Sequence, residues 1–193
     1  MTNVHGTLES ARLRLRPATA DDAAALAAVL DGADVRPFPW DDCALDADRV
    51  RALLADVAAA GAPHGVWFID CGRSGATCGC VGLLPPGTAA EADERLMHTS
   101  EPVVALQAEH RGVGHATEAL TLVLARAFHG HGWVRLAAAV AVDDAAARRL
   151  AERLGFRALG ETDGPRGRLR TYILDRQGFL AADVEERPER GAA

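Results

Sequence analysis

The chain has 193 residues, a formal net charge of −6 and 49% hydrophobic residues, which suits a single folded domain with a substantial core. The acidic balance excludes a broadly basic nucleic-acid-binding surface and favours a cationic or amine partner. No run of about 18 residues is free of charge, and the first residues lack the basic and apolar regions of a secretory signal. We therefore expect a cytoplasmic protein that binds neither nucleic acid nor a membrane.

Secondary structure is predicted from the apolar periodicity and from the turn and cap residues between periodic segments. Thr19 is a plausible cap of the first helix. Asp143 or Asp144 caps the last predicted helix, and Gly155 closes it. In chain order, the sequence predicts a strand at 12–17, helices at 20–32 and 46–60, a hairpin of 65–70 with 76–84, a strand at 101–107, a helix at 115–129, a strand at 134–142, a helix at 144–155 and a hairpin of 156–161 with 168–174.

This order of elements predicts one α/β (α+β) domain over residues 1–180. We expect a mixed central sheet of six to seven strands, flanked by about four helices. Residues 181–193 are polar with a charged end, so we expect a flexible tail there.

The four cysteines are Cys43, Cys71, Cys78 and Cys80. Cys78 and Cys80 form a C-x-C pair within an apolar segment, whereas a zinc site favours C-x-x-C pairs or histidines nearby. We therefore expect buried free thiols and no metal ion.

A glycine turn, HRGVGHATEAL at residues 110–120, joins the strand at 101–107 to the helix that follows. The motif of a P-loop is excluded because no lysine follows these glycines. A dinucleotide-binding fingerprint is disfavoured because its third glycine position holds Thr117 and the next candidate acid, Asp143, lies too far downstream. The remaining interpretation is a site for a pyrophosphate, held by the N–H groups of the turn and the helix N-terminus.

The residues of this turn carry a resemblance to a known family. Arg111, Gly114 and Ala116 match the R/Q-x-x-G-x-G/A acyl-CoA loop of the GNAT N-acetyltransferases. The segments TEAL and ARAF, the helix from Asp144 to the Gly155-Phe pair, and the opening RLRLRP resemble the ribosomal-protein (RimJ/RimL-like) branch. The resemblance covers residues 13–174 and implies a GNAT-like fold.

The family resemblance implies acetyl-CoA as the co-substrate and no metal. Two strands, 101–107 and 134–142, would splay apart to admit the pantetheine arm. Its partners would be backbone groups of Val104, Ala105 and Leu106. The residues expected at the pyrophosphate are Arg111, Gly112, Val113, Gly114, His115 and Ala116.

The reaction implied is direct attack of a neutral amine on the acetyl thioester, with Glu101 or His98 as candidate base. Two positions depart from the family pattern, because its pantetheine-contacting asparagine is Asp144 here and its serine is Ala147. A tyrosine that other members carry is Ala151, so the resemblance supplies no general acid.

The loop between the first two predicted helices would shape the acceptor site, with Phe38 and Trp40 as walls and Asp41 or Asp42 attracting an ammonium group. The alternative is a loop that its aromatic residues pack onto the core. The expected acceptor is a peptide N-terminus or a small amine. Homodimers are common in the superfamily. The alternative is a catalytically weak CoA-binding sensor or assembly module of the same fold.

Overall fold

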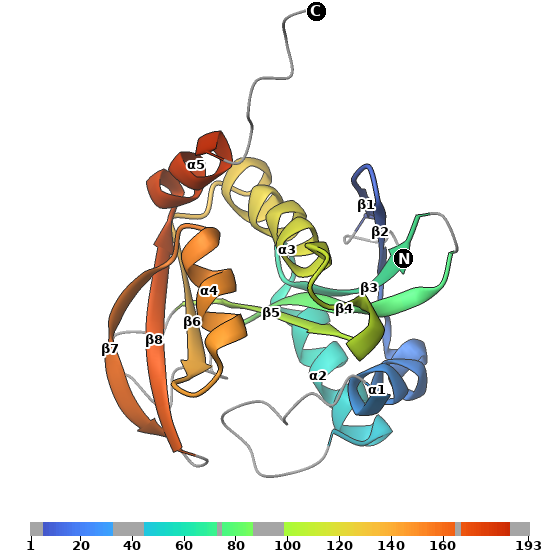
Figure 1. Cartoon of the computed structure of the whole chain (residues 1–193). Helices are drawn as coiled ribbons and strands as arrows, with labels where there is room; N and C mark the ends of the chain where they lie inside the picture. Colours follow the sequence, from blue (N-terminus) through green and yellow to red (C-terminus); the bar gives the residue numbers. More distant parts are fainter. Residues whose placement is uncertain (1–5, 33–44, 73–74, 87–98, 165–166, 186–193) are drawn as a thin grey trace, which may run out of the picture.

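The computed structural model describes residues 6–32, 45–72, 75–86, 99–164 and 167–185, which form two β-sheets with helices packed against them (Figure 1). The first sheet has the strand order β1-β2-β3-β4-β5, and every pairing is antiparallel. Its strands are β1 (Leu8–Glu9), β2 (Leu13–Pro17), β3 (Gly65–Cys71), β4 (Thr77–Leu84) and β5 (Glu101–Leu106).

The second sheet has the order β6-β8-β7 and is also antiparallel. Its strands are β6 (Arg135–Ala141), β7 (Arg157–Gly164) and β8 (Gly167–Asp175). The sheets meet where the N–H group of Ala137 donates to the carbonyl oxygen of Ser100 at 3.1 Å. In the described chain no β-ladder joins β5 to β6. The α/β class is thus confirmed. The described residues form two sheets where one was expected, because β5 and β6 diverge, and eight strands where six to seven were expected, because β1 is added.

Helices cover both faces of the first sheet. On one face, α1 (Ala23–Gly32) and α2 (Ala47–Ala60) bury an apolar core against β3 and β4. On the other face, α3 (His115–Ala125) packs its buried residues against β2, β3 and β4, and this core continues into the second sheet. The α3 helix therefore lies between the two sheets and is fixed by both.

The predicted cap and stop of α4 (Ala145–Arg153) are confirmed. The Asp144 carboxylate accepts a hydrogen bond from the N–H group of Ala147 at 2.9 Å, as an N-cap does. Gly155 has a φ of 87°, the left-handed conformation that ends a helix and that glycine adopts without strain.

Two elements of the described chain were not predicted, the two-residue strand β1 and the helix α5 (Arg176–Glu185). With α5 the described residues contain five α-helices, where about four were expected. β1 is too short to show a period. α5 extends through Glu185, into the segment that the sequence analysis leaves as a tail. The carboxylate of Asp175, just before this helix, accepts a hydrogen bond from the N–H group of Gly178 at 2.8 Å, as an N-cap residue does. None of the described helices is both long and apolar enough to cross a membrane.

Candidate functional site

The glycine turn has the backbone shape that anion binding requires. The chain leaves β5, makes the short 3₁₀ turn η4 (Ala108–His110) and enters α3. Gly112 and Gly114 have φ angles of 76° and 87°, where residues with a Cβ are strained. Gly114 is the N-cap residue of α3, and no side chain caps this helix. The first N–H groups of α3 have no partner within the helix and can therefore serve a ligand.

The other residues of the turn lie next to these N–H groups. Arg111 folds back toward the sheet, where its Nε donates to the carbonyl oxygen of Leu106 at 2.9 Å. The Val113 side chain is 53% exposed, whereas His115 and Ala116 are half-buried. The six consecutive residues expected at the pyrophosphate thus form the turn and the first residues of α3, and their contact with a pyrophosphate stays a prediction.

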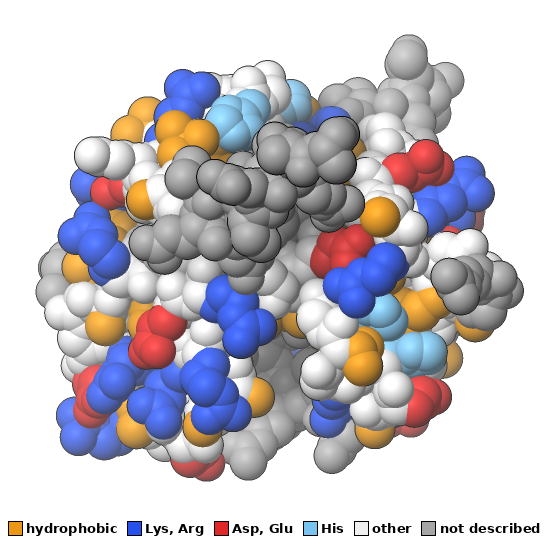
Figure 2. Space-filling view, turned by 45° about the horizontal axis from the view of Figure 1, so that its top comes forward, with side chains coloured by type: hydrophobic (Ala, Val, Ile, Leu, Met, Phe, Trp, Pro, Cys, Tyr) orange, Lys and Arg blue, Asp and Glu red, His pale blue; other side chains and the backbone are white. Residues whose placement is uncertain are grey.

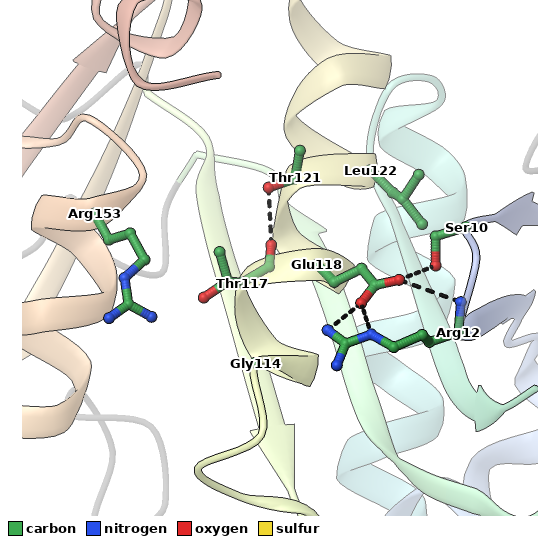
Figure 3. Close-up of a pocket in the computed structure, with 8 residues that line it drawn as sticks. All are labelled: Ser10, Arg12, Gly114, Thr117, Glu118, Thr121, Leu122 and Arg153. Carbon is green, nitrogen blue, oxygen red and sulfur yellow. Dashed lines mark hydrogen bonds and ion pairs between the residues drawn. The ribbon is translucent and has the colours of Figure 1, made fainter. Parts of the chain in front are cut away.

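A polar clamp holds the start of α3 against the segment between β1 and β2 (Figure 3). Arg12 donates from Nε to Glu118 at 2.6 Å and from its NH1 nitrogen to the carbonyl oxygen of Val113 at 3.0 Å. The hydroxyl of Ser10 donates to the same carboxylate at 2.6 Å. Although burial opposes it, hydrogen bonds from Ser10 and Arg12 hold the pKa of Glu118 below its ordinary value. Sequence reasoning missed this clamp, because its two sides are about a hundred residues apart.

A cavity of about 380 Å³ adjoins the clamp and the turn. Thr117 and Thr121 of α3 face Arg153 of α4 across it (Figure 3). The complete lining is Ser10, Arg12, Gly114, Thr117, Glu118, Thr121, Leu122 and Arg153. Figure 2 shows further arginine side chains gathered over the part of the molecule that carries α4, β7 and β8. The lining suits a polar, anionic ligand. Glu101 is not part of it.

Glu101 lies where β5 and β6 diverge. It begins β5, is 3% exposed and accepts a hydrogen bond from the N–H group of Ala139 on β6 at 3.3 Å. The carboxylate therefore bridges the two strands at the point where backbone pairing between them ends. A buried carboxylate at such an opening can also accept a proton from a reacting group.

The register of β5 decides which backbone groups face the opening. The carbonyl oxygens of Ser100 and Leu106 point away from β4, toward Ala137 and Arg111 respectively. Because backbone groups alternate along a strand, those of Val104 face the same way. The carbonyl of Ala105 points to β4, where a Cβ added to Gly79 would lie 2.1 Å from it.

A buried histidine that the sequence analysis did not single out lies next to Glu101. Nδ1 of His64 is 3.0 Å from the carbonyl oxygen of Gly61, so it carries the proton. Nε2 then accepts from the hydroxyl of Ser100 at 2.7 Å. Burial lowers the pKa of His64. The hydrogen bond between His64 and Ser100 thus joins the residue before β3 to the residue before β5. No sequence motif predicts this contact.

The residues of α4 that depart from the family pattern have structural partners here. The carboxylate of Asp144 caps the helix by accepting a hydrogen bond from the N–H group of Ala147. Ala151 is buried. Tyr172, the single tyrosine, is fully buried on β8 with its hydroxyl 3.4 Å from Glu152, and burial raises its pKa.

Five of the predicted site residues lie outside the described part of the chain: His98, Phe38, Trp40, Asp41 and Asp42.

The expectation of free thiols is confirmed for Cys71, Cys78 and Cys80. Burial raises the pKa of Cys78 and of Cys80 to about 12. Cys71 is only half-buried, and its Sγ lies 3.8 Å from Nδ1 of His110. Burial, with Arg12 and His110 nearby, lowers the pKa of His115.

Comparisons with known proteins identify the family and the fold of the chain. The profile of the acetyltransferase (GNAT) domain matches residues 12–157. Comparison with curated sequences gave no match. Among solved structures, a protein from Bordetella pertussis assigned to the GnaT acetyltransferase family is 22% identical with a TM-score of 0.75, covering 88% of this chain and 99% of that one.

Two further solved structures have the same fold. The ribosomal-protein-S5-alanine acetyltransferase from Vibrio fischeri is 14% identical with a TM-score of 0.69, covering 88% of this chain and 96% of that one. RimJ from Mycobacterium smegmatis, in complex with CoA-disulfide, is 17% identical with a TM-score of 0.66 and covers 94% of each chain. With a domain profile that spans most of its length, this chain belongs to the GNAT acetyltransferase family.

Proposed function

We propose that this chain is an acetyl-CoA-dependent N-acetyltransferase that acetylates a primary amine by direct attack. One observation carries the proposal: the uncapped, glycine-shaped start of α3 follows directly on β5, and β5 begins with a buried carboxylate at its divergence from β6. An anion site and a proton acceptor at the two ends of one strand are what acyl transfer from a phosphate-bearing thioester needs.

The residues that would hold acetyl-CoA are those of the turn and of the β5 edge. Arg111, Gly112, Val113 and the N–H groups of residues 114–116 serve the pyrophosphate. Val104 offers an N–H and a C=O group toward the opening, as an added strand would require. The start of α4, with Asp144 and Ala147, would adjoin the same arm. Arg153 and the threonines of the cavity suit the nucleotide end.

Acetyl-CoA supplies the acetyl thioester, and the chain must orient the amine and accept its proton. Glu101 is the proposed base, acting directly or through water, and its bond from Ala139 fixes the carboxylate. No side chain is assigned as general acid: Ala147 and Ala151 have no proton to donate, and Tyr172 is fully buried with its hydroxyl 3.4 Å from Glu152. The thiolate leaves by taking a proton from water or from the new ammonium group.

The acceptor class is proposed from charge and from the relatives. A net charge of −6 favours a cationic acceptor. One structural neighbour is titled a ribosomal-protein-S5-alanine acetyltransferase, and another is RimJ. We therefore place a peptide N-terminus first and a small amine second, consistent with the RimJ/RimL-like branch.

The test is release of the CoA thiol from acetyl-CoA in the presence of three acceptors: a peptide with N-terminal alanine, a polyamine and an aminoglycoside. The expected result is release that depends on enzyme and on one acceptor class, with a mass increase of one acetyl group on that acceptor. The proposal fails if the folded protein binds acetyl-CoA and turns over none of them.

That second outcome is what the alternative function predicts, a CoA-binding sensor or assembly module. The observation that favours it is that Ala147 and Ala151 of α4 have no proton to donate, while the Asp144 carboxylate caps the helix. Stabilisation by CoA and acetyl-CoA without turnover distinguishes it from the enzyme.

A further inference from the structure

Four potential metal ligands converge under the glycine turn, although they are distant in sequence. One ligand atom each of Cys71, Cys78, His110 and His115 lies within 4.8 Å of every other. They come from four elements: the end of β3, the start of β4, the turn η4 and the first residue of α3. From this convergence we propose that the chain binds one Zn²⁺ ion through a Cys₂His₂ site.

A β-bulge brings Cys78 into the cluster. Ile69 pairs with Gly79, but Asp70 pairs with Thr77, so Cys78 is the extra residue between them. A bulge turns a side chain from its regular direction. Cys78 accordingly contributes to the core under α3.

Cys80 shows what the bulge changes. Residues two apart in a regular strand share a face. Cys80, however, belongs to the core under α1 and α2, on the face opposite to Cys78. The C-x-C pair is therefore split, and only its first thiol can join Cys71.

The distances fit a tetrahedral zinc ion. With Zn–S of about 2.3 Å and Zn–N of about 2.0–2.1 Å, neighbouring ligand atoms lie about 3.4–3.8 Å apart. Sγ of Cys71 and Nδ1 of His110 are already 3.8 Å apart. The widest separation, 4.8 Å, closes with movements of about 1 Å. Two thiolates and two imidazoles are also the ligand set that zinc favours.

The buried Nδ1 atom of His115 also supports a metal ion in this cluster. Among the described residues, this atom has no hydrogen-bond partner. A buried polar atom without a partner is costly, and an ion in the cluster removes that cost by engaging the ring. Cys71, His110 and His115 are only half-buried, so an ion can enter from the surface.

Zinc here fixes the glycine turn. His110 and His115 flank residues 111–114, so the ion ties both ends of the turn to β3 and β4. The N–H groups at the start of α3 remain on the backbone. The inference does not rest on the proposed acetyl transfer, because it concerns metal binding alone.

The experiment is zinc titration of the full chain, purified without an affinity tag under reducing conditions, in competition with a chromophoric chelator. Wild type should bind about one equivalent. Cys71→Ser and His110→Asn should weaken zinc binding at least about 100-fold, because changes to residues that only contact a metal ligand already cost about 10- to 100-fold in affinity. Cys80→Ala and His131→Asn are the matched controls and should bind as wild type does. Circular dichroism checks that each variant is folded.

Cobalt substitution gives a second readout. Co²⁺ in the wild type should show the visible bands of a tetrahedral ion and a thiolate charge-transfer band, which weakens in Cys71→Ser but not in Cys80→Ala. Substoichiometric zinc, equal binding by Cys71→Ser and Cys80→Ala, or a Cys71–Cys78 disulfide in the reduced preparation would each overturn the proposal.

Discussion

At the scale of single residues, Glu101 combines a structural and a proposed chemical role. Its carboxylate accepts a bond from Ala139 and is also the proposed base. Glu101→Gln keeps an oxygen that can accept this bond and removes the proton acceptor. We expect turnover to fall by about 100-fold or more, with acetyl-CoA affinity and folding unchanged. Full activity of Glu101→Gln at neutral pH would remove Glu101 from the mechanism.

The buried histidine predicts how stability depends on pH. The folded-state pKa of His64 lies below its ordinary value of 6.5 because of burial. Below pH 6.5 the unfolded chain binds the proton more readily, so stability falls as pH drops toward the folded-state pKa and is fully present above 6.5.

Urea unfolding between pH 5 and pH 7.5 measures this dependence. The free energy of unfolding of wild type should rise with pH over the lower part of this range. His64→Asn should rise less steeply, because the titrating ring is gone. Ser100→Ala keeps the buried ring and should keep the slope. Equal slopes for wild type and His64→Asn would show that His64 does not titrate in this range.

At the scale of elements, the clamp between α3 and the segment that joins β1 to β2 is expected to matter more than an ordinary surface ion pair. Arg12 contacts both Glu118 and the carbonyl of Val113, and the Glu118 side chain is only 19% exposed. Arg12→Ala should lower the free energy of unfolding by about 1–2 kcal/mol. Arg14→Ala is the matched control, two residues further along the chain on β2. Its pair with Glu9 is exposed and 3.6 Å long, so a loss below about 0.5 kcal/mol is expected.

Urea denaturation of both variants separates the two cases. Equal losses for Arg12→Ala and Arg14→Ala would mean that the clamp contributes no more than a solvent-exposed pair.

Turns and helix ends could be predicted from the sequence where the conformational preference of one or two residues determines them. The turn at Gly112 and Gly114, and the cap Asp144 with the stop Gly155, follow from conformational preferences of single residues. The bulge at Cys78 could not be predicted, because it depends on pairing between strands. The cluster under the turn also could not, since four segments supply one ligand each.

At the scale of the whole molecule, α5 is part of the fold and not an appendage. Phe179 is 3% exposed and stacks on Phe128, with ring centroids 5.4 Å apart. Phe179→Ala should lower the free energy of unfolding by about 3–5 kcal/mol. The adjacent Leu180 is 41% exposed, and Leu180→Ala should cost less than about 1 kcal/mol. A small effect of Phe179→Ala in thermal unfolding would show that α5 is dispensable.

The architecture follows from element order, but the division into two sheets does not. The order of strands and helices restricts the chain to a few α/β arrangements, which is why the fold class could be predicted. Where β5 and β6 separate depends on Glu101 accepting the N–H group of Ala139, a contact 38 residues apart.

The central claim is that the turn before α3 holds the pyrophosphate of acetyl-CoA. Its most direct test is thermal unfolding with acetyl-CoA, CoA, NAD and ATP in parallel, for wild type, Val113→Glu and Val113→Gln. At 100 times the dissociation constant, acetyl-CoA and CoA should raise the wild-type midpoint by roughly 5–10 °C, and NAD should not. Val113→Glu places a negative charge in the turn and should weaken binding roughly tenfold, whereas Val113→Gln should not. No rise with either CoA compound, or an equal rise with NAD, would contradict the account.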